Sequence, residues 1–166
     1  MATFESAFGR FNKISSEQIE FIIRGATFEL FKNIVYGTPV DTGRAKVNWQ
    51  ISIDREINSS LIDYDKDGNK TVNKGKIEIE KPLGKYIYIQ NNLSYISALE
   101  FGLYPNPVKK GSRRKNASKD DAIKYEVKST GGYSYQAPQG MVRINLVRMN
   151  TLIRRYRNKF AEKRIK

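Results

Sequence analysis

The segment TPVDTGRAKVNWQ, residues 38–50, separates two different hydrophobic patterns and so decides the fold. Before it, residues 16–36 place apolar side chains three or four positions apart, a spacing that predicts an amphipathic helix. After it, Trp49, Ile51 and Ile53 alternate with polar residues, which predicts a half-buried strand. The segment is therefore expected to be a tight corner between a helix and a strand.

The residue types within this corner indicate how the chain turns. Gly37 and Pro39 are expected to stop the preceding helix, because both disfavour a helical continuation. Asp41 is a suitable N-cap for a short helical turn over residues 44–48. Gly43 suits a tight backbone position that other residues adopt with strain. These roles predict that the corner holds geometry.

The predicted N-terminal helix has two local features. Ser15 and Gln18 have the spacing of a capping box, so the helix is expected to begin there. Gly25 lies inside the helix and indicates either a local weakness or a point of close packing.

Two segments after the corner predict further strands. Residues 76–81 alternate, with Ile77 and Ile79 on one face, and residues 85–90, KYIYIQ, are rich in strand-forming residues. Between these strands and the first lie the turn-forming residues 63–70, DYDKDGNK. Three strands in series favour an antiparallel meander.

The C-terminal half predicts two helices. Residues 94–101 form a short helix that Gly102 closes, and Pro138 suits the first turn of a final helix. The apolar stripe of that helix comprises Val142, Leu146, Met149, Ile153, Tyr156 and Phe160. The predicted fold class is α+β: a long N-terminal helix, a three- to four-stranded antiparallel sheet, a short helix, and a long C-terminal helix packed on the sheet.

Residues 103–132, which we call the basic segment, differ in composition from the rest. They hold eight lysines and arginines against three acidic residues, with two prolines and three glycines. This composition predicts a surface loop inserted into a single domain of residues 1–166, which ends in a basic tail at residues 161–166. The candidate contacts to an anionic partner are Lys109, Lys110, Arg113, Arg114, Lys115, Arg154, Arg155 and Arg157.

The composition excludes several classes of site. The formal net charge is +13, which favours an anionic partner such as nucleic acid or an acidic protein. The sequence contains no cysteine and no histidine, so disulfides, the usual zinc and haem sites, and imidazole-based triads are not expected. The chain has no apolar run of ~20 residues, and its first residues lack the apolar region of a signal peptide. We expect no cofactor and no membrane association.

Two candidate chemistries were weighed and disfavoured. Asp63, Asp65, Asp67 and Gly68 match the first half of a calcium-binding loop, but the twelfth position, where a glutamate is required, is lysine. Thr42 as a nucleophile would need an adjacent base, and nothing in the spacing singles one out. We therefore expect neither a metal site nor catalysis.

Three segments carry a resemblance when they are taken together and in order. They are TPVDTGRAKVNWQ, then YIQNNLSYISALEFG at residues 88–102, and YSYQAPQGMVRINLVRM at residues 133–149. They resemble the tail-completion and neck proteins of tailed bacteriophages, which join head to tail and are sometimes described as minor tail components. The matching residues are Thr38, Pro39, Val40, Asp41, Thr42, Gly43, Arg44, Trp49, Asn91, Asn92, Leu93, Tyr95, Leu99, Glu100, Phe101, Gly102, Gln136, Ala137, Pro138, Gly140, Met141, Val142 and Arg143.

The resemblance implies a structural virion protein and not an enzyme. Such proteins form rings, commonly sixfold, at the top of the tail, between a tail-tube or tail-terminator protein and a head-completion or connector protein. Double-stranded DNA passes through the ring, and assembly takes place in the host cytoplasm. The chain departs from the family at Ser94, where proline is usual, at Phe101, where tyrosine is common, and in the length of the basic segment. The alternative interpretation is a basic nucleic-acid-binding module.

Overall fold

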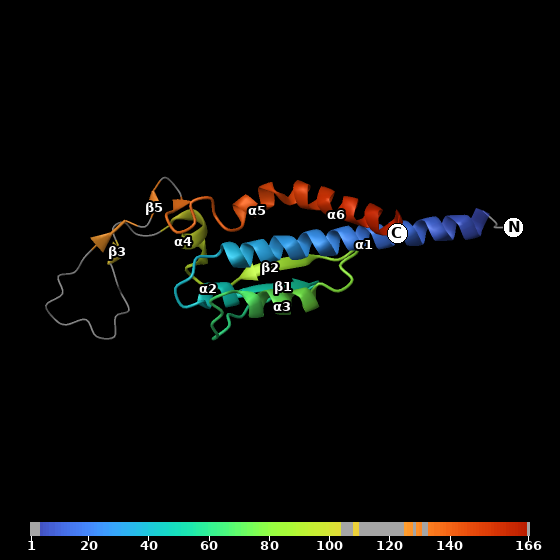
Figure 1. The fold of residues 1–166 in the computed structure, drawn as a ribbon. Coiled ribbons are helices and arrows are strands. Elements are labelled where there is room, and N and C mark those ends of the chain that lie inside the picture. Colours follow the sequence, from blue (N-terminus) through green and yellow to red (C-terminus); the bar gives the residue numbers. More distant parts are fainter. Residues whose placement is uncertain (1–3, 104–107, 110–124, 128, 131–132, 166) are drawn as a thin grey trace.

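The computed structural model describes residues 4–103, 108–109, 125–127, 129–130 and 133–165 of the chain. The molecule is elongated, and its centre is one long helix, α1 (Phe4–Gly37). A two-stranded sheet lies along one side of α1, and helix α6 (Met149–Ile165) lies along the other (Figure 1). The mixed helix-and-sheet fold predicted from the sequence is confirmed at this level.

Helix α1 confirms the predicted N-terminal helix but begins earlier. It starts at Phe4, so Ser15 lies inside the helix and the predicted capping box is wrong. Its C-terminal half supplies much of the hydrophobic core. The buried side chains of α1 are Ala26, Thr27, Leu30, Phe31, Ile34 and Val35.

The sheet has two strands where three or four were predicted. Strand β1 (Trp49–Ile53) pairs antiparallel with β2 (Ile87–Asn91), in a register that places Trp49 opposite Asn91. Both strands were predicted. Trp49 and Ile51 are buried, as period-two alternation requires, but the predicted alternation fails at the end of β1, where Ser52 is buried and Ile53 is half-buried.

The predicted strand at residues 76–81 is wrong, because the first half of this segment belongs to helix α3 (Asn69–Glu78) and the rest forms no strand. Ile77 is 71% exposed, whereas Ile79, just past the helix, is buried. Val72, Gly75 and Ile79 have helical spacing and form the inner face. A Cβ atom on Gly75 would lie 2.2 Å from the ring of Phe31, so this glycine lets α3 approach α1.

Two short helices flank the sheet. Helix α2 (Arg44–Val47) has Gly43 at its N-cap, and Asp41 is exposed, so the predicted capping by Asp41 is wrong. The hydroxyl of Thr42 accepts a hydrogen bond from the Arg44 amide at 3.3 Å instead. Helix α4 (Ile96–Phe101) ends at Gly102 with a φ of 69°, as predicted.

The C-terminal helix was predicted to begin near Pro138 and to pack on the sheet. It begins instead at α5 (Arg143–Val147), breaks at Arg148 and continues as α6. It packs on α1, because α1 already lies between it and the sheet (Figure 1). The break also shifts the apolar stripe. Leu152 is buried, whereas Leu146 and Ile153 are exposed.

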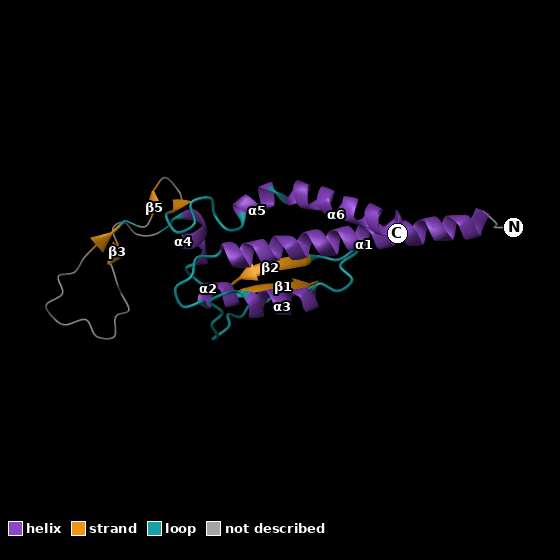
Figure 2. Cartoon of the chain, viewed as in Figure 1, coloured by secondary structure: helices purple, strands orange, loops and turns teal. Residues whose placement is uncertain are grey.

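Part of the basic segment forms short antiparallel pairs, drawn in orange in Figure 2. Strand β3 (Val108–Lys109) pairs with β4 (Tyr125–Glu126), and β5 (Ser129–Thr130) pairs with β6 (Tyr133–Ser134). No helix in the described part of the chain combines the length and apolar character needed to cross a bilayer.

Gly25 is the point of close contact between α1 and α6. A Cβ atom there would lie 2.1 Å from the ring of Tyr156, so alanine requires the two helices to move apart. We expect Gly25→Ala to lower the free energy of unfolding by about 1–3 kcal/mol, the usual cost of overpacking. The measurement is denaturant unfolding of the purified protein.

Gly9→Ala is the matched control in the same helix. A Cβ atom on Gly9 meets no atom within 4 Å. This substitution should leave stability unchanged or raise it by up to about 1 kcal/mol through helix propensity. Equal effects of the two substitutions would contradict the proposed role of Gly25.

Candidate functional site

The corner that follows α1 is held by a chain of hydrogen bonds. The indole N–H of Trp49 donates to the hydroxyl of Thr38 at 2.8 Å, and this hydroxyl donates to the carbonyl of Ile34 at 2.7 Å. Trp49 is 6% exposed and Thr38 is 2% exposed, so both bonds are shielded from water. The corner therefore ties the end of α1 to the start of β1.

Gly43 joins the corner to the loop before α3. Its φ of 89° is in the left-handed region, and a Cβ atom on it would lie 2.6 Å from the backbone of Asp65. The Asp65 amide donates to the Gly43 carbonyl at 3.3 Å. Both features require glycine at this position, as expected from the sequence.

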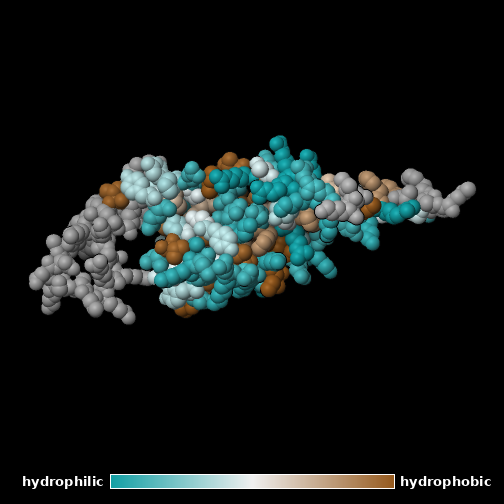
Figure 3. All heavy atoms as spheres, viewed as in Figure 1, coloured by the Kyte–Doolittle hydropathy of each residue, from teal (hydrophilic) through white to brown (hydrophobic). Residues whose placement is uncertain are grey.

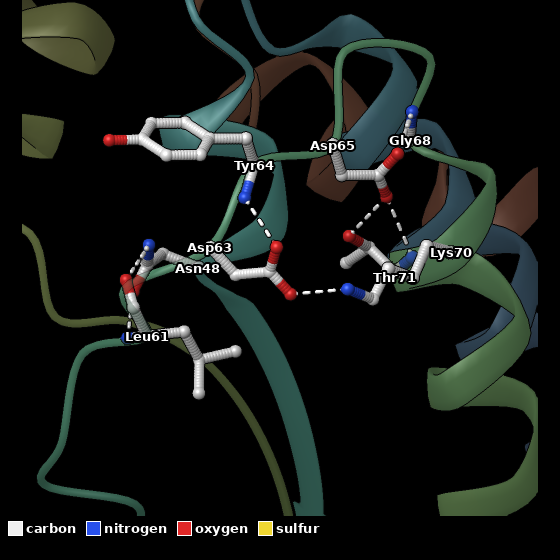
Figure 4. Close-up of polar contacts among 8 residues, drawn as sticks. All are labelled: Asn48, Leu61, Asp63, Tyr64, Asp65, Gly68, Lys70 and Thr71. Atoms are coloured by element: carbon white, nitrogen blue, oxygen red, sulfur yellow. Dashed lines mark hydrogen bonds and ion pairs between the residues drawn. The ribbon is translucent and has the colours of Figure 1, made fainter.

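The three aspartates of the calcium-like pattern each serve a different local role, and Figure 4 draws two of them, Asp63 and Asp65. Asp65 is buried, and its carboxylate accepts hydrogen bonds from the amides of Gly68 and Thr71 at 2.9 and 2.8 Å and from the Thr71 hydroxyl at 2.6 Å. It therefore holds the first turn of α3 in place. Asp63 forms an ion pair with Lys70.

Hydrogen bonds lower the pKa values of the other two aspartates, Asp63 and Asp67. The hydrogen bond from Lys70, with that from the Tyr64 amide, lowers the pKa of Asp63. The hydrogen bond from the Asn69 amide lowers the pKa of Asp67. Among the described residues, no group of three acidic side chains is arranged to hold a metal ion.

After the corner and the aspartate loop, a third group of hydrogen bonds forms around Glu100, which is 5% exposed. We call this group the Glu100 cluster. One oxygen of its carboxylate accepts hydrogen bonds from the amides of Met141 and Val142 at 2.5 and 3.0 Å. The other accepts from the amide and Nε of Arg143 at 3.0 and 3.2 Å. Two of the segments that carry the resemblance, 41 to 43 residues apart in sequence, thus meet at one side chain.

The charge of Glu100 is stabilised in spite of its burial. Burial by itself would raise the pKa of Glu100, but the three backbone N–H groups and the Arg143 side chain outweigh it, so the pKa is lowered. The Arg143 guanidinium also donates to the Glu100 carbonyl and lies 4.9 Å from the centre of the Phe101 ring. The carboxylate is therefore ionised at neutral pH.

Two glycines make room for this cluster. A Cβ atom on Gly140 would lie 2.3 Å from the Glu100 carboxylate, and one on Gly102 would lie 2.1 Å from the carbonyl oxygen of Tyr133. Both glycines have positive φ, 72° and 69°. Pro138 is exposed, two residues before Gly140 in the turn that precedes α5.

Amide side chains of asparagine and glutamine hold the loop at residues 55–61 in place. The sequence analysis identified only some of these residues. Asn92, a predicted site residue, donates to the carbonyls of Ile57 and Ser59. Asn91 donates to the Ala45 carbonyl at 2.9 Å. Buried Asn48 was missed; its amide nitrogen donates to the Leu61 carbonyl at 3.1 Å, and the Leu61 amide donates back at 2.6 Å (Figure 4).

The missed residues Asn48, Gln50 and Gln90 share a signal that the sequence contains. They lie on the polar side of the strand alternation, and Gln50 is opposite Gln90 in the register. Gln50 donates to the Ser59 carbonyl, and the Gln90 side chain accepts from the Ile57 amide, each at 2.9 Å. Asparagine and glutamine side chains are common on the polar face of a strand. Their presence in the sequence therefore did not indicate that they hold the loop at residues 55–61.

A pocket of about 220 Å³ lies where the three segments of the resemblance meet. Its lining includes most of the corner together with Tyr95, Leu99 and Gln136. Arg44 is also a lining residue, and its Nε atom is buried and has no hydrogen-bond partner among the described residues. The corner residues in the lining are Pro39, Val40, Asp41, Thr42, Gly43, Arg44 and Ala45.

A larger pocket, of about 530 Å³, lies between β1, the loop at residues 55–61 and α3. Its floor includes Phe31, Trp49 and Ile51, all buried, and its rim carries charged residues that include the ion pair of Asp63 and Lys70. Of the residues predicted from the sequence to form the site, only Trp49 lines it.

The predicted anion-contacting residues fall into two groups. Lys110, Arg113, Arg114 and Lys115 lie outside the described residues, and of Lys109 only the backbone, in β3, is described. The α6 residues Arg154, Arg155 and Arg157 are exposed, and Arg155 lies 3.8 Å from the carboxylate of Glu29. This face is mostly hydrophilic (Figure 3).

The arrangement of these groups suits the maintenance of backbone geometry. The hydroxyl of Thr38 and the carboxylates of Asp65 and Glu100 each hold a turn or a helix end through hydrogen bonds. Thr71 lines the larger pocket and its hydroxyl donates to the Asp65 carboxylate at 2.6 Å, but this carboxylate also accepts from the amides of Gly68 and Thr71, so the contact serves to hold the start of α3.

Comparison with known proteins returned no match. No protein-family model, no curated protein and no solved structure is significantly similar to this chain.

Proposed function

We propose that this chain is a structural virion protein of a tailed bacteriophage, a ring-forming tail-completion or neck subunit at the junction of head and tail. The observation that carries the proposal is that the three resembling segments meet at the 220 Å³ pocket, and that two of them are also joined by the Glu100 cluster. The segments that carry the resemblance lie apart in the sequence, but their residues are in contact in the structure. They therefore form one structural unit.

The polar groups of this unit support a role that is architectural. Glu100 and Thr38 are both buried and hold the backbone in place, and the buried Asp65, which lies outside the three segments, does the same at the start of α3. A subunit of a ring needs such rigid corners, because a small change in the angle between neighbours accumulates around the ring. The chain is therefore proposed to act by its shape and its contacts, without catalysis or cofactor.

The test is the location of the protein in particles of the virus that encodes it. We expect mass spectrometry to find the chain in purified particles, and electron microscopy with a label at the C-terminus to place it between head and tail. Particles made without the gene should accumulate as filled heads and separate tails. Its absence from the particles, or normal joining without the gene, would refute the proposal.

Exposed arginines on α6 favour a second candidate, the basic nucleic-acid-binding module. If Arg154 and Arg157 contact phosphates, the affinity for DNA should fall steeply with salt, with a logarithmic slope of about −0.9 for each contact. Replacing both by alanine would then reduce the slope by about 1.8. Assembly into rings in the absence of DNA favours the first candidate, and steep DNA binding by a monomer favours the second.

A further inference from the structure

Strand β1 is paired along one edge only. It hydrogen-bonds to β2, and no other strand in the described part of the chain joins this sheet. The Asp54 amide donates to the Tyr86 carbonyl at 2.9 Å, in the same register that pairs Ser52 with Tyr88. Because the hydrogen-bonded pairs of an antiparallel ladder alternate, the N–H and C=O of Ser52 point toward β2, whereas those of Ile51 point away from it.

The backbone of Ile51 therefore has two polar groups that the sheet leaves unused. Ile51 is 3% exposed, and its outward N–H and C=O have no hydrogen-bond partner among the described residues. A buried backbone donor or acceptor without a partner costs free energy and is rare in a folded protein. We call this side of residues 49–53 the open edge of β1.

The open edge faces the 530 Å³ pocket. Strand β1 lies between β2 and α3 (Figure 1), so the edge that points away from β2 points toward α3. Trp49 and Ile51 line the pocket from β1, and Lys74 and Gly75 line it from α3. A strand added to the open edge therefore enters the pocket.

The loop at residues 55–61 forms another wall of the pocket and leaves the open edge uncovered. Gln50 holds this loop through its side chain, which donates to the Ser59 carbonyl at 2.9 Å. No backbone hydrogen bond joins the loop to β1 among the described residues. The ion pair of Asp63 and Lys70, which both line the pocket, joins the chain after this loop to α3 (Figure 4).

The floor of the pocket indicates which side chains an added strand carries. Phe31, Trp49 and Ile51 form this floor, and all three are buried. The volume of about 530 Å³ lies within the roughly 300–1,000 Å³ of ordinary binding sites. Since every second side chain of a strand points to the same face, the occupant that matches both the floor and the open edge is an extended peptide with apolar residues at alternate positions.

Charge indicates the source of this peptide. The rim carries as many cationic as anionic residues, so it favours a segment without net charge; they are Arg55, Lys70, Lys74, Glu56, Asp63 and Glu78. The whole chain has a formal net charge of +13, which attracts a partner of opposite charge. A second copy carries the same charge, and its uncharged strands β1 and β2 are already paired with each other.

We propose that the open edge of β1 binds an extended segment of an acidic partner protein, which joins the sheet as a third strand. The backbone of this segment pairs with the N–H and C=O of Ile51, and its apolar side chains enter the 530 Å³ pocket. In such a contact the main-chain hydrogen bonds give affinity and the pocket gives a preference for side chains. The site goes beyond the neck function proposed above, because peptide binding is a property of the isolated protein.

The test uses the purified full chain as bait for a library of random dodecapeptides displayed on yeast. We expect enrichment of peptides with an uncharged centre, apolar residues at alternate positions and acidic residues at the ends. Amide hydrogen exchange with a synthetic copy of the most enriched peptide then locates the contact. Exchange at Ile51 should slow at least about tenfold on binding. The Ser52 amide, which already donates within the sheet, is the internal control and should slow less.

Methylation of the peptide's backbone nitrogens supplies the matched control. Each methyl group removes one N–H donor and leaves the side chains unchanged. In a strand, the N–H groups point alternately toward and away from the neighbouring strand. Methylation should therefore weaken binding at least about tenfold at every second central position and less than about twofold at the positions between.

Three results would overturn the proposal: no enriched peptide, enriched peptides that leave the exchange of Ile51 unchanged, or equal losses at adjacent methylated positions. The outcomes also separate this site from the proposed function. A peptide that protects Ile51 in a chain absent from virus particles would keep the site and remove the neck function. A chain found in the neck whose Ile51 amide no peptide protects would keep the function and remove the site.

Discussion

Glu100→Ala is expected to lower the free energy of unfolding by about 3–5 kcal/mol. The substitution removes the acceptor of three backbone N–H groups, those of Met141, Val142 and Arg143, and the ion partner of Arg143. These donors lie in a part of the molecule where Glu100 is 5% exposed, so water replaces the lost bonds poorly. The measurement is chemical denaturation at pH 7.

Glu100→Gln separates the charge of the side chain from its shape. The amide keeps one acceptor oxygen but turns donors toward the other N–H groups, so we expect a loss of about 1–3 kcal/mol. The pKa of Glu100 is lowered from its ordinary value of 4.5, so the ionised form stabilises the fold. This contribution is fully present above that ordinary value, and it is lost as the pH falls through the lower pKa of the folded state.

The pH dependence supplies an independent check of the charge. The difference in stability between the wild type and Glu100→Gln should be largest at neutral pH and should narrow as the pH falls below about 4.5. A difference that stays constant from pH 7 to pH 3 would show that the carboxylate charge contributes nothing. A loss under about 1 kcal/mol for Glu100→Ala would show that the cluster is not a structural support.

Trp49→Ala is expected to destabilise the protein by about 3–5 kcal/mol, the usual cost of removing a buried aromatic side chain. Trp49 is 6% exposed and lies in the core that joins α1 to the sheet. The substitution also removes the hydrogen bond from the indole to the Thr38 hydroxyl. That hydroxyl donates in turn to the Ile34 carbonyl at the end of α1. The measurement is the midpoint and slope of denaturant unfolding.

Trp49→Phe is the control that isolates the hydrogen bond from the packing. It keeps most of the apolar area and removes the indole N–H, so we expect a loss of about 1–2 kcal/mol. A double-mutant cycle with Thr38→Val measures the coupling of the two side chains, which should exceed about 0.5 kcal/mol because they are in direct contact. A Trp49→Ala loss under about 1 kcal/mol would place the tryptophan outside the core.

Local sequence patterns correctly predicted the elements whose hydrophobic pattern extends over many residues or whose end is marked by a glycine. The helical period of α1 and the strand state of β1 and β2 are confirmed, as is the end of α4 at Gly102. The segment at residues 76–81 was too short for its period to distinguish a strand from a helix. Its helical state depends on contacts elsewhere, in particular the approach of Gly75 to Phe31.

The sequence identified the residues of the candidate site better than their roles. Gly43, Trp49, Glu100 and Gly140 all lie in the clusters that hold the corner and the α5 turn. The expected cap Asp41 is exposed, and Thr42 accepts the hydrogen bond instead. Asn48 and Asp65 went unrecognised as buried acceptors, because a single polar residue beside a turn has many possible partners.

By itself, the sequence determined where the chain turns, which segments are apolar on one face, and which classes of metal and imidazole chemistry the composition disfavours. These properties are local, because a backbone period and a glycine conformation act over a few residues. Only the tertiary structure decided that Glu100 holds the turn at residues 140–143, that α6 packs on α1, and that the 220 Å³ pocket brings together residues of the corner, α4 and the turn before α5. These contacts join residues far apart in the chain, and their partners depend on the path of the whole backbone.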